Sequence, residues 1–386
     1  MSPAYRRRLI IYLVIPIGVG LAAYLLTALP YTKYTRAGYE LLAFLLVADL
    51  AAALAGAWRN AAIVAAATIF GLSAIEFACA AMEPGDAIYA RNFSTSDPVL
   101  GWRSLVPGVY RSYKIGGAGQ LIYSADYTID NHLLRRTLSG TGGPGVAFFG
   151  DSLTFGQGLA DADTLPQIYA DLNGRKTVVL NLGFPGYGPQ QMLRALETGL
   201  FDPLLAGTKI FIFETAAWHA ERAACRPGFM ARAPRYELRD GEPVFVGACG
   251  EGINQVFREV VLGSKTYHRL LEPIFDAARP QDVEIYVAEL RRSAELAKQK
   301  YGARLIALYI SESDRYLAPT GFTDAQIKNK LRQSGVEVVD ATLDPRNFPA
   351  GTLFKIPGDG HPTAIANRAR AQILENYLSE VKTTAR

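Results

Sequence analysis

The segment GVAFFGDSLTFGQGLADADTLPQ, residues 145–167, decides which fold this chain adopts. Its first part, Val146 to Phe149, is a short apolar run of the kind that forms a buried strand. The run ends abruptly at Gly-Asp-Ser, so Ser152 lies just past the strand, where α/β folds place reactive groups. The alternative interpretation is an ordinary strand-to-helix connection in which the Ser or the Asp caps the helix.

Strand-like apolar runs alternate with helical patterns after residue 145, and this alternation predicts a parallel sheet with helices on both faces. The predicted strands are 146–149, 177–182, 209–213, 304–310 and 336–339. The predicted helices are 164–172, 189–200, 281–300 and 323–333. The Gly-rich stretch SGTGGPG at 139–145 indicates a boundary. We therefore predict an extended or β-rich lead-in over residues 84–140 and an α/β domain over residues 141–386.

Three apolar segments predict an N-terminal membrane anchor of about three helices within residues 1–83. They cover residues 9–31, 41–58 and 61–82, and a helix of about 20 apolar residues is long enough to span a bilayer. Arginines precede the first segment and follow the second, which places both of these ends on the cytoplasmic side. Three spans then place the rest of the chain on the periplasmic or extracellular side, whereas two spans would leave it in the cytoplasm. We expect Glu76, in the third segment, to lie at the membrane interface.

The charge balance argues against one class of partner, and the cysteines bear on the compartment. With 40 Lys and Arg against 36 Asp and Glu, the sequence gives no support for binding nucleic acid, which needs a clustered basic face. Cys225 and Cys249 flank a predicted hairpin centred on Arg239-Asp240-Gly241-Glu242. A hairpin brings its ends together, so these two cysteines are candidates for a disulfide outside the cytoplasm. Two unpaired thiols are the alternative.

The chain has 4 histidines, and this scarcity narrows the search for a base that would activate Ser152. A serine nucleophile at neutral pH needs an adjacent general base, usually a histidine. His361 lies in the loop GDGHP before a C-terminal helix, and Asp359, two residues earlier, is placed to orient its imidazole. Taken alone, this loop favours an ordinary surface turn with polar caps.

Two further segments follow predicted strands beside Ser152 and offer donors to a developing oxyanion. NLGFPGYG follows the second strand, and a glycine there lets a backbone N–H approach an oxyanion without interference from a side chain. FIFETAAWHAER follows the third strand and carries Trp218 and His219. A side-chain N–H at this point would complete an oxyanion hole.

Together, FFGDSLTFGQG, NLGFPGYG and GDGHP resemble three blocks of the GDSL/SGNH hydrolase superfamily, over roughly residues 145–378. The resemblance implies a three-layer α/β/α fold like that of flavodoxin, with a mostly parallel five-stranded sheet. It implies Ser152 as nucleophile, His361 as base and Asp359 as its acidic partner. The backbone N–H groups of Ser152 and Gly183 would form the oxyanion hole. It also implies acyl-ester chemistry without a metal or an organic cofactor.

The sequence departs from the family pattern at two positions. The third block usually carries an Asn that supports the oxyanion, and here His219 is the candidate donor, because a neutral imidazole can donate one hydrogen bond. The alternative is a histidine packed under the inserted hairpin at 225–249. The Asp-x-His spacing replaces the usual Asp-x-x-His, so Asp340 is a second candidate for orienting His361.

Two charged residues near the site are interpreted as structural. Asp151 adjoins the nucleophile, but its place on the turn points its side chain away from the site, so we assign it to loop structure. Arg222 follows His219 in the third block, and we expect it to pair with nearby carboxylates rather than to bind an anionic group of a substrate.

Three functions fit these residues. The first is a membrane-anchored serine esterase that hydrolyses O-acyl esters, chiefly acetyl esters, of a carbohydrate or lipid. The second is a polysaccharide O-acyltransferase with the same Ser-His-Asp site, working with a membrane-bound partner of a polysaccharide-modifying system, as membrane-tethered relatives do. The third is a degenerate domain that binds a glycan or supports a membrane complex, which the missing Asn favours. Intact Ser152, Asp359 and His361 argue against this third hypothesis.

Overall fold

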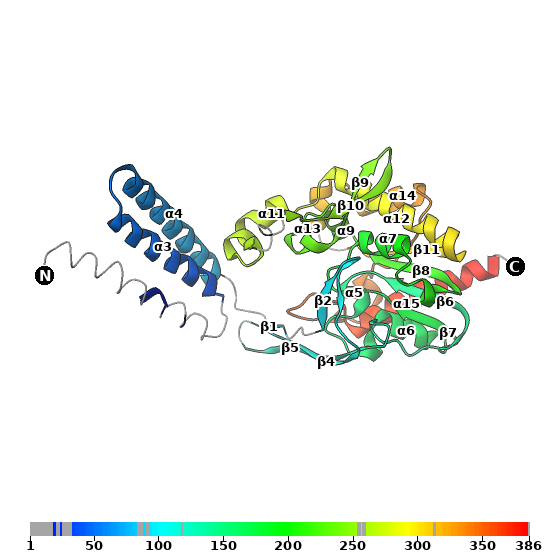
Figure 1. Cartoon of the computed structure of the whole chain (residues 1–386). Helices are drawn as coiled ribbons and strands as arrows, with labels where there is room; N and C mark the ends of the chain where they lie inside the picture. Colours follow the sequence, from blue (N-terminus) through cyan, green and yellow to red (C-terminus); the bar gives the residue numbers. More distant parts are fainter. Residues whose placement is uncertain are drawn as a thin grey trace. The chain divides into compact units, whose positions relative to one another are not determined.

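The structure is a computed structural model, and it describes residues 18–20, 24, 33–82, 88–89, 93–116, 119–252, 256, 260–311 and 314–384. The chain forms two compact units (Figure 1). The N-terminal unit comprises Met1–Asp86 together with Val260–Pro273, and the second unit comprises Ala87–Glu259 together with Ile274–Arg386. A short segment from the middle of the chain therefore belongs to the N-terminal unit.

The N-terminal unit is built on two helices, α3 (Thr35–Ala53) and α4 (Gly56–Ala81), which pack against each other. Within the described residues, α4 alone is long and apolar enough to cross a membrane by length and composition. The predicted helix 9–31 lies almost entirely outside the described residues. Three spans, and the side of the membrane on which the second unit lies, therefore stay predictions.

The helix boundaries in this unit differ from the predicted segments 41–58 and 61–82. The break falls at Leu54 and Ala55, where Gly56 adopts the left-handed conformation with φ of 58°. The predicted break at Arg59 and Asn60 lies inside α4. Arginine is a good helix former, so polar character by itself does not end a helix. Here α3 ends where the backbone of Leu54 becomes extended, and α4 begins at Gly56.

Glu76 is fixed by contacts within the N-terminal unit. Its carboxylate accepts hydrogen bonds from the Ser264 hydroxyl at 2.8 Å and from the backbone N–H groups of Lys265 and Thr266 at 2.6 and 2.9 Å. The residue is 1% exposed. A buried carboxylate is tolerated when it accepts several hydrogen bonds, and here these bonds hold the segment 264–266 on α4. The expected position of Glu76 at a membrane interface stays a prediction.

The second unit contains a five-stranded parallel sheet in the order β12-β11-β8-β6-β7. In chain order these strands are β6 (Gly142–Phe149), β7 (Thr177–Asn181), β8 (Thr208–Thr215), β11 (Arg304–Tyr309) and β12 (Glu337–Asp340). Counted from the first, the order across the sheet is 2-1-3-4-5, which is that of flavodoxin-like folds. The predicted fold class of the α/β domain is confirmed.

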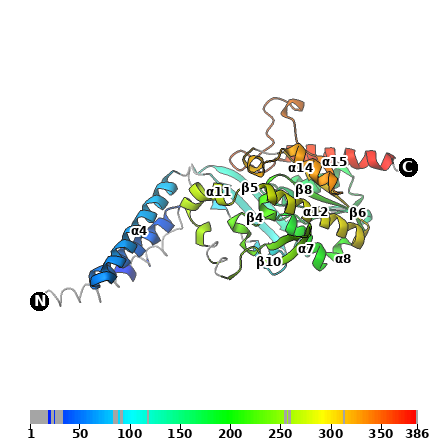
Figure 2. The ribbon, with the colours of Figure 1, turned by 90° about the horizontal axis from the view of Figure 1, so that it is seen from above.

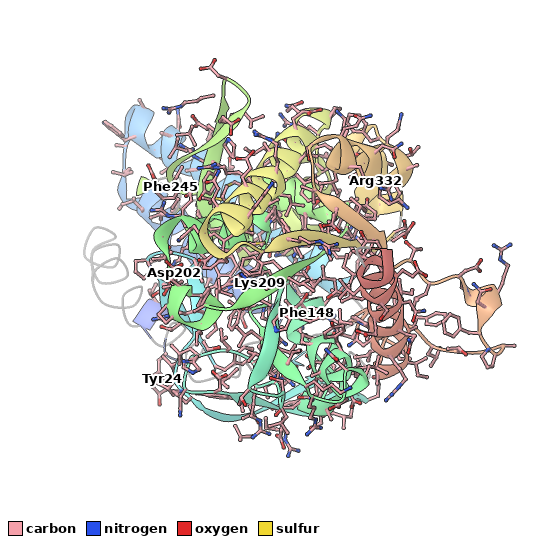
Figure 3. All side chains as sticks on the ribbon, turned by 90° about the vertical axis from the view of Figure 1, so that its right-hand side faces the viewer. Tyr24, Phe148, Asp202, Lys209, Phe245 and Arg332 are labelled. Atoms are coloured by element: carbon pink, nitrogen blue, oxygen red, sulfur yellow. A yellow bond between two sulfur atoms is a disulfide. The ribbon has the colours of Figure 1, made fainter. Side chains whose placement is uncertain are left out.

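Helices cover both faces of this sheet, and the residues of β6 alternate between the two cores. Ala147 and Phe149 face a core shared with α7 (Pro189–Thr198), α12 (Pro280–Tyr301) and α14 (Asp324–Gln333). Val146 and Phe148 face a core shared with α6 (Leu165–Leu172) and α15 (Ala364–Thr384). In Figure 3, Phe148 lies in the interior between these layers and Arg332 at the periphery. A strand buried on both faces reads as a continuous apolar run, which is why this stretch stood out in the sequence.

The lead-in forms two small antiparallel sheets in the second unit. One pairs β2 (Ser94–Asp97) with β3 (Gly101–Ser104), and the other has the order β1 (Ile88–Tyr89), β4 (Gly108–Ile115) and β5 (Leu121–Ile129). Aromatic side chains join these sheets to the α/β domain. Phe93 and Tyr127 pack against Phe155, with ring centroids 5.4 and 5.2 Å apart, and Phe155 lies just after Ser152 in the chain.

The inserted hairpin consists of β9 (Pro234–Arg239) and β10 (Glu242–Ala248). Its turn residues Asp240 and Gly241 have φ of 53° and 81°, as expected for a two-residue turn of type I′. A disulfide joins Cys225 to Cys249, with the two Cα atoms 5.5 Å apart. One loop of the connection 341–363, between β12 and α15, projects from the body of the unit (Figure 2).

Glu289 is a buried carboxyl on α12 with an unusual environment. The residue is fully buried, and within the described part of the chain neither carboxyl oxygen has a hydrogen-bond partner. Burial raises the pKa of Glu289 well above its ordinary value, and the negative charge of Glu197 raises it further. Burial therefore favours the protonated form of the side chain in the folded state, since an unpaired buried charge is costly.

We expect replacement of Glu289 by leucine to weaken the pH dependence of stability. The folded state keeps a proton that the unfolded chain releases above its ordinary pKa of 4.5. This stabilising contribution is complete below that pH and is lost as the pH rises, by up to about 1.4 kcal/mol per pH unit. Melting temperatures at acid and mildly alkaline pH measure the effect. Glu284→Leu, on the exposed side of α12, is the control, and equal pH dependence in Glu289→Leu and wild type would contradict the prediction.

Candidate active site

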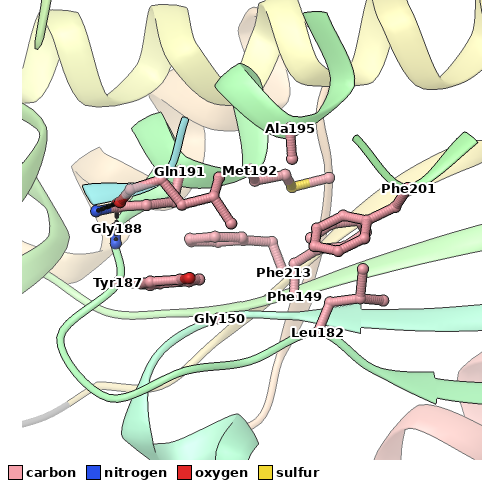
Figure 4. A pocket seen from close by; sticks show the side chains of 11 residues that line it. Phe149, Gly150, Leu182, Tyr187, Gly188, Gln191, Met192, Ala195, Phe201 and Phe213 are labelled. Carbon is pink, nitrogen blue, oxygen red and sulfur yellow. Dashed lines mark hydrogen bonds between the residues drawn. The ribbon is translucent and has the colours of Figure 1, made fainter. Parts of the chain in front are cut away.

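Ser152 stands at a sharp turn between β6 and the short helix α5 (Ser152–Phe155). Only glycine fits at Gly150, because a Cβ atom there would lie 2.3 Å from the Thr154 hydroxyl oxygen. Asp151 caps α5 by accepting a hydrogen bond from the Leu153 N–H at 2.9 Å. Gly150 also borders a small pocket with apolar walls that include Phe149, Leu182, Met192 and Phe213 (Figure 4). The turn is thus held by the Asp151 cap and by the close approach of Thr154 to Gly150.

The structure brings Ser152, His361 and Asp359 into one row of contacts. The His361 Nε2 atom lies 2.9 Å from the Ser152 Oγ, although the residues are 209 positions apart in the chain. The His361 Nδ1 atom contacts the Asp359 Oδ1, and the backbone N–H of His361 donates to the same oxygen at 3.3 Å. The carboxyl side chain is 1% exposed and the imidazole 18%. Nδ1 therefore carries the proton toward the carboxylate, and Nε2 is left to accept the proton of the serine hydroxyl.

The carboxylate of Asp359 is ionised throughout the range of pH in which enzymes are assayed. Burial alone would raise its pKa, but His361 and Lys114, by hydrogen bonds and by their charges, outweigh burial and lower the pKa to about 2. Asp340, the second candidate for orienting His361, instead pairs with Lys328 at 2.5 Å and is partly exposed. The structure therefore places Asp359, and not Asp340, against the imidazole.

The expected role of Gly183 is not compatible with its hydrogen bonds. Its N–H donates to the Asn181 Oδ1 at 3.1 Å, while the Asn181 Nδ2 donates to the Thr154 carbonyl at 3.0 Å. A Cβ atom at Gly183 would lie 2.7 Å from the Thr154 Cβ, so this glycine permits close packing against α5. The N–H of Gly183 is therefore already engaged, and this glycine fixes the nucleophile turn from behind.

Gly186, in the same segment, has the properties expected of a donor. It lies in a turn closed by the hydrogen bond from the Tyr187 N–H to the Phe184 carbonyl at 3.1 Å, and its φ of 84° favours glycine. Trp102 steadies this turn by donating its indole N–H to the Pro185 carbonyl at 2.9 Å. In the described part of the chain, the Gly186 N–H has no hydrogen-bond partner, and the residue is partly exposed. Sequence spacing could not separate Gly186 from Gly183.

His219 is a core residue, and the expectation that it donates to an oxyanion is wrong. The imidazole is completely buried, with Nδ1 3.0 Å from the Thr215 hydroxyl and Nε2 3.7 Å from the Asp151 carboxylate. Burial lowers the pKa of His219 to about 3, so the ring is neutral. His219 is the second residue of α9 (Trp218–Ala223), and its ring lies in the core beside Phe213. Both ring nitrogens face groups of the protein itself.

Asp151 does more than shape a loop. Its Oδ2 accepts hydrogen bonds from the Trp218 indole at 3.0 Å and from the Arg222 guanidinium at 2.6 Å, and the side chain is 1% exposed. Burial would raise the pKa of Asp151, but the charge and hydrogen bond of Arg222, with the hydrogen bond from the Leu153 N–H, outweigh burial and lower the pKa. The expected pairing of Arg222 with a carboxylate is confirmed. Trp218 and Arg222 are four residues apart on α9, so helical spacing was the available signal for this network.

Comparison with known proteins finds solved structures that are similar to part of this chain. No protein-family model matches the sequence, and no curated protein matches it. A member of the lipolytic G-D-S-L family from Veillonella parvula is similar at 14% identity and a TM-score of 0.35, over 61% of this chain and 97% of that chain. A lipase/acylhydrolase from Enterococcus faecalis is similar at 12% identity and a TM-score of 0.33, over 61% and 95%. A catalytic mutant of an acetylxylan esterase from Geobacillus stearothermophilus is similar at 13% identity and a TM-score of 0.33, over 62% and 95%.

Because these TM-scores are low, the assignment of the fold rests on this chain's own strands and contacts. The strand order, with the Gly-Asp-Ser turn at the end of the first sheet strand, defines a flavodoxin-like α/β fold. Among the described residues, no group of three or more His, Cys, Asp or Glu side chains is arranged to hold a metal ion.

Proposed function

We propose that the protein is a serine ester hydrolase that works through an acyl-enzyme on Ser152. The observation that carries the proposal is the row of contacts from the Ser152 hydroxyl through His361 to the ionised Asp359. The serine oxygen attacks the carbonyl carbon of the ester while the His361 Nε2 takes its proton. Asp359 stabilises the imidazolium ion, which then returns the proton to the departing alcohol. Water, activated by the same imidazole, attacks the acyl-enzyme and releases the acid.

Two backbone N–H groups are proposed to stabilise the oxyanion of the tetrahedral intermediate. In the described part of the chain, neither the Ser152 N–H nor the Gly186 N–H has an acceptor within the protein. Donors that are already in place cost no reorganisation when the charge develops, and losing one costs on the order of 10²- to 10³-fold in turnover. This proposal replaces the expected pair of Gly183 and His219, whose polar groups are engaged elsewhere.

The substrate that we propose is an O-acyl, chiefly acetyl, ester of a carbohydrate or lipid outside the cytoplasm. The apolar helix α4 supports attachment to a membrane, and the disulfide between Cys225 and Cys249 supports an oxidising compartment. Transfer of the acyl group to a sugar hydroxyl, in a polysaccharide-modifying system with a membrane-bound partner, would use the same acyl-enzyme. The two reactions differ only in the acceptor, so product analysis distinguishes them.

The test compares the full chain in detergent with its Ser152→Ala variant on 4-nitrophenyl acetate, with and without an added oligosaccharide. We expect turnover in the wild type and its loss in Ser152→Ala, because the attacking oxygen is gone. A phosphonate ester should label the wild type at Ser152, as read by mass spectrometry. Ser334→Ala, at the end of α14, is the matched control for loss of a hydroxyl. Equal turnover and labelling in wild type and Ser152→Ala would refute the proposal, whereas acylated sugar would identify a transferase.

A further inference from the structure

Lys114, in the lead-in, contacts the carboxylate that orients His361. Its ammonium Nζ lies 2.8 Å from the Asp359 Oδ2, and the two residues are 245 positions apart in the chain. The side chain of Lys114 is 10% exposed and that of Asp359 is 1% exposed. The two oxygens of the carboxylate are thus divided between two cationic groups, with Oδ1 facing the imidazole and Oδ2 facing the ammonium.

An irregularity in the lead-in sheet places Lys114 at this point. The pairing of β4 with β5 shifts register between Lys114 and Ile115, so that Ile122 on β5 has no partner in the ladder. Such a bulge re-aims side chains. Ile122 packs on the loop of His361. Its Cδ1 atom lies so close to Gly358 that a Cβ atom added to this glycine would be 3.0 Å away. The lead-in therefore contacts the loop of Asp359 and His361 with both an apolar and a charged side chain.

The Asp-x-His spacing explains why an external contact matters. Asp359 folds back on its own loop to reach the His361 ring, and one oxygen receives both the ring contact and the backbone N–H of His361. The other oxygen is buried and would carry uncompensated charge without Lys114, which is costly in a protein interior. The ion pair fixes the plane of the carboxylate, and with it the direction of the imidazole.

We infer that Lys114 is a positioning residue of the active site, which holds Asp359 in the orientation that aims His361 at Ser152. The lead-in then completes the active site in addition to connecting it to the N-terminal unit. This inference rests on the proposed function, since it assigns Lys114 to the same reaction. Lys114 touches Asp359 and not the reacting atoms.

The charge of Lys114 also predicts a change in the pH profile. His361 on its own loop and Lys114 on β4 are the charged groups that the structure places against Asp359, and Asp359 and Ser152 contact the imidazole. Without the ammonium, the full negative charge of Asp359 acts on the ring and favours the imidazolium form. The base is then unavailable until a higher pH, so the acid limb of kcat/KM moves to higher pH.

The experiment uses the full chain in detergent and compares Lys114→Met, Lys114→Gln and Lys114→Arg with wild type on 4-nitrophenyl acetate. We expect Lys114→Met to lower kcat about 10- to 100-fold with KM little changed, since a misaimed base costs rate without touching the substrate. Its acid limb should move to higher pH. Lys114→Gln should move the acid limb with a smaller fall in kcat, and Lys114→Arg should restore most of both.

Arg111→Met is the matched control, because Arg111 lies on the same strand and pairs with Asp126 across the hairpin at the surface, 2.7 Å away. It should behave as wild type. A kcat and an acid limb in Lys114→Met and Lys114→Gln equal to those of wild type would overturn the inference. A fall in kcat that follows a lower melting temperature, with the acid limb unmoved, would overturn it too. If wild type and Ser152→Ala are equally inactive, it is the proposed function that fails.

Discussion

Replacing His361 with alanine is expected to lower kcat for ester hydrolysis by about a million-fold, the scale found when the base of a serine triad is removed. The reason is the 2.9 Å contact between Nε2 and the Ser152 Oγ, which is the only route by which the hydroxyl proton leaves in the proposed reaction. A serine hydroxyl is a weak nucleophile at neutral pH without an adjacent base. The double variant with Ser152→Ala should be no slower than either single variant, because the two residues act as one unit.

Initial rates of the full chain on 4-nitrophenyl acetate measure this loss, with melting temperatures to verify that the variant folds. His132→Ala is the matched control, since His132 is exposed in a turn after β5 and only its backbone N–H is seen to bond, to Asp130. It should retain full activity. A His361→Ala variant that keeps activity within tenfold of wild type would show that another group serves as the base.

The α/β domain could be predicted from sequence because each of its strands has a recognisable apolar pattern within a few residues. The run Val146–Phe149 is buried on both faces of the sheet, so it is apolar at every position, and the same holds for most of Arg304–Tyr309. Helices between such runs leave a parallel sheet as the natural arrangement. The contact of Ser152 with His361 and of His361 with Asp359 could also be predicted. The sequence offers few other histidines as the base, and the motifs that carry these residues are short.

The donors to the oxyanion and the role of His219 could not be predicted, for a physical reason. Whether a backbone N–H is available depends on the acceptor that the fold brings to it, and Asn181 takes the N–H of Gly183 two residues away. His219 has the residue type of a donor, but α9 turns it into the core, where Thr215 and Asp151 surround it. The spacing of the motif predicts neither the acceptor of the Gly183 N–H nor the burial of His219.

The contact of Lys114 with Asp359 could not be predicted from sequence, for a different reason. This contact joins a strand of the lead-in to a loop near the C-terminus, and it depends on a local shift of strand register. A lysine on a short strand with alternating polarity is ordinarily solvent-exposed. The same limit applies to Glu76, whose hydrogen bonds come from residues almost 200 positions later in the chain.

Replacing Asp359 with asparagine is expected to lower kcat by about four orders of magnitude while Ser152 and His361 stay in place. The amide keeps the shape of the carboxylate but removes the charge that stabilises the imidazolium ion, and its NH₂ group can hold the ring in the wrong tautomer. Because the pKa of Asp359 is lowered to about 2, the wild-type carboxylate is charged at every pH at which the enzyme would be assayed. The loss should therefore be complete at neutral and alkaline pH, and the acid limb of kcat/KM should move to lower pH, because the ring loses the negative charge that favours its imidazolium form.

Asp340→Asn is the matched control, because Asp340 was the other candidate for this role and lies against Lys328 instead of the imidazole. Its kcat should equal that of wild type. The Asp359→Asn variant also leaves the buried ammonium of Lys114 facing a neutral group, so its melting temperature should fall, while combining it with Lys114→Met should recover stability without recovering rate. A larger loss of kcat in Asp340→Asn than in Asp359→Asn would reverse the assignment of the acidic residue. Recovery of rate in the double variant would mean that the carboxylate serves the ion pair and not the reaction.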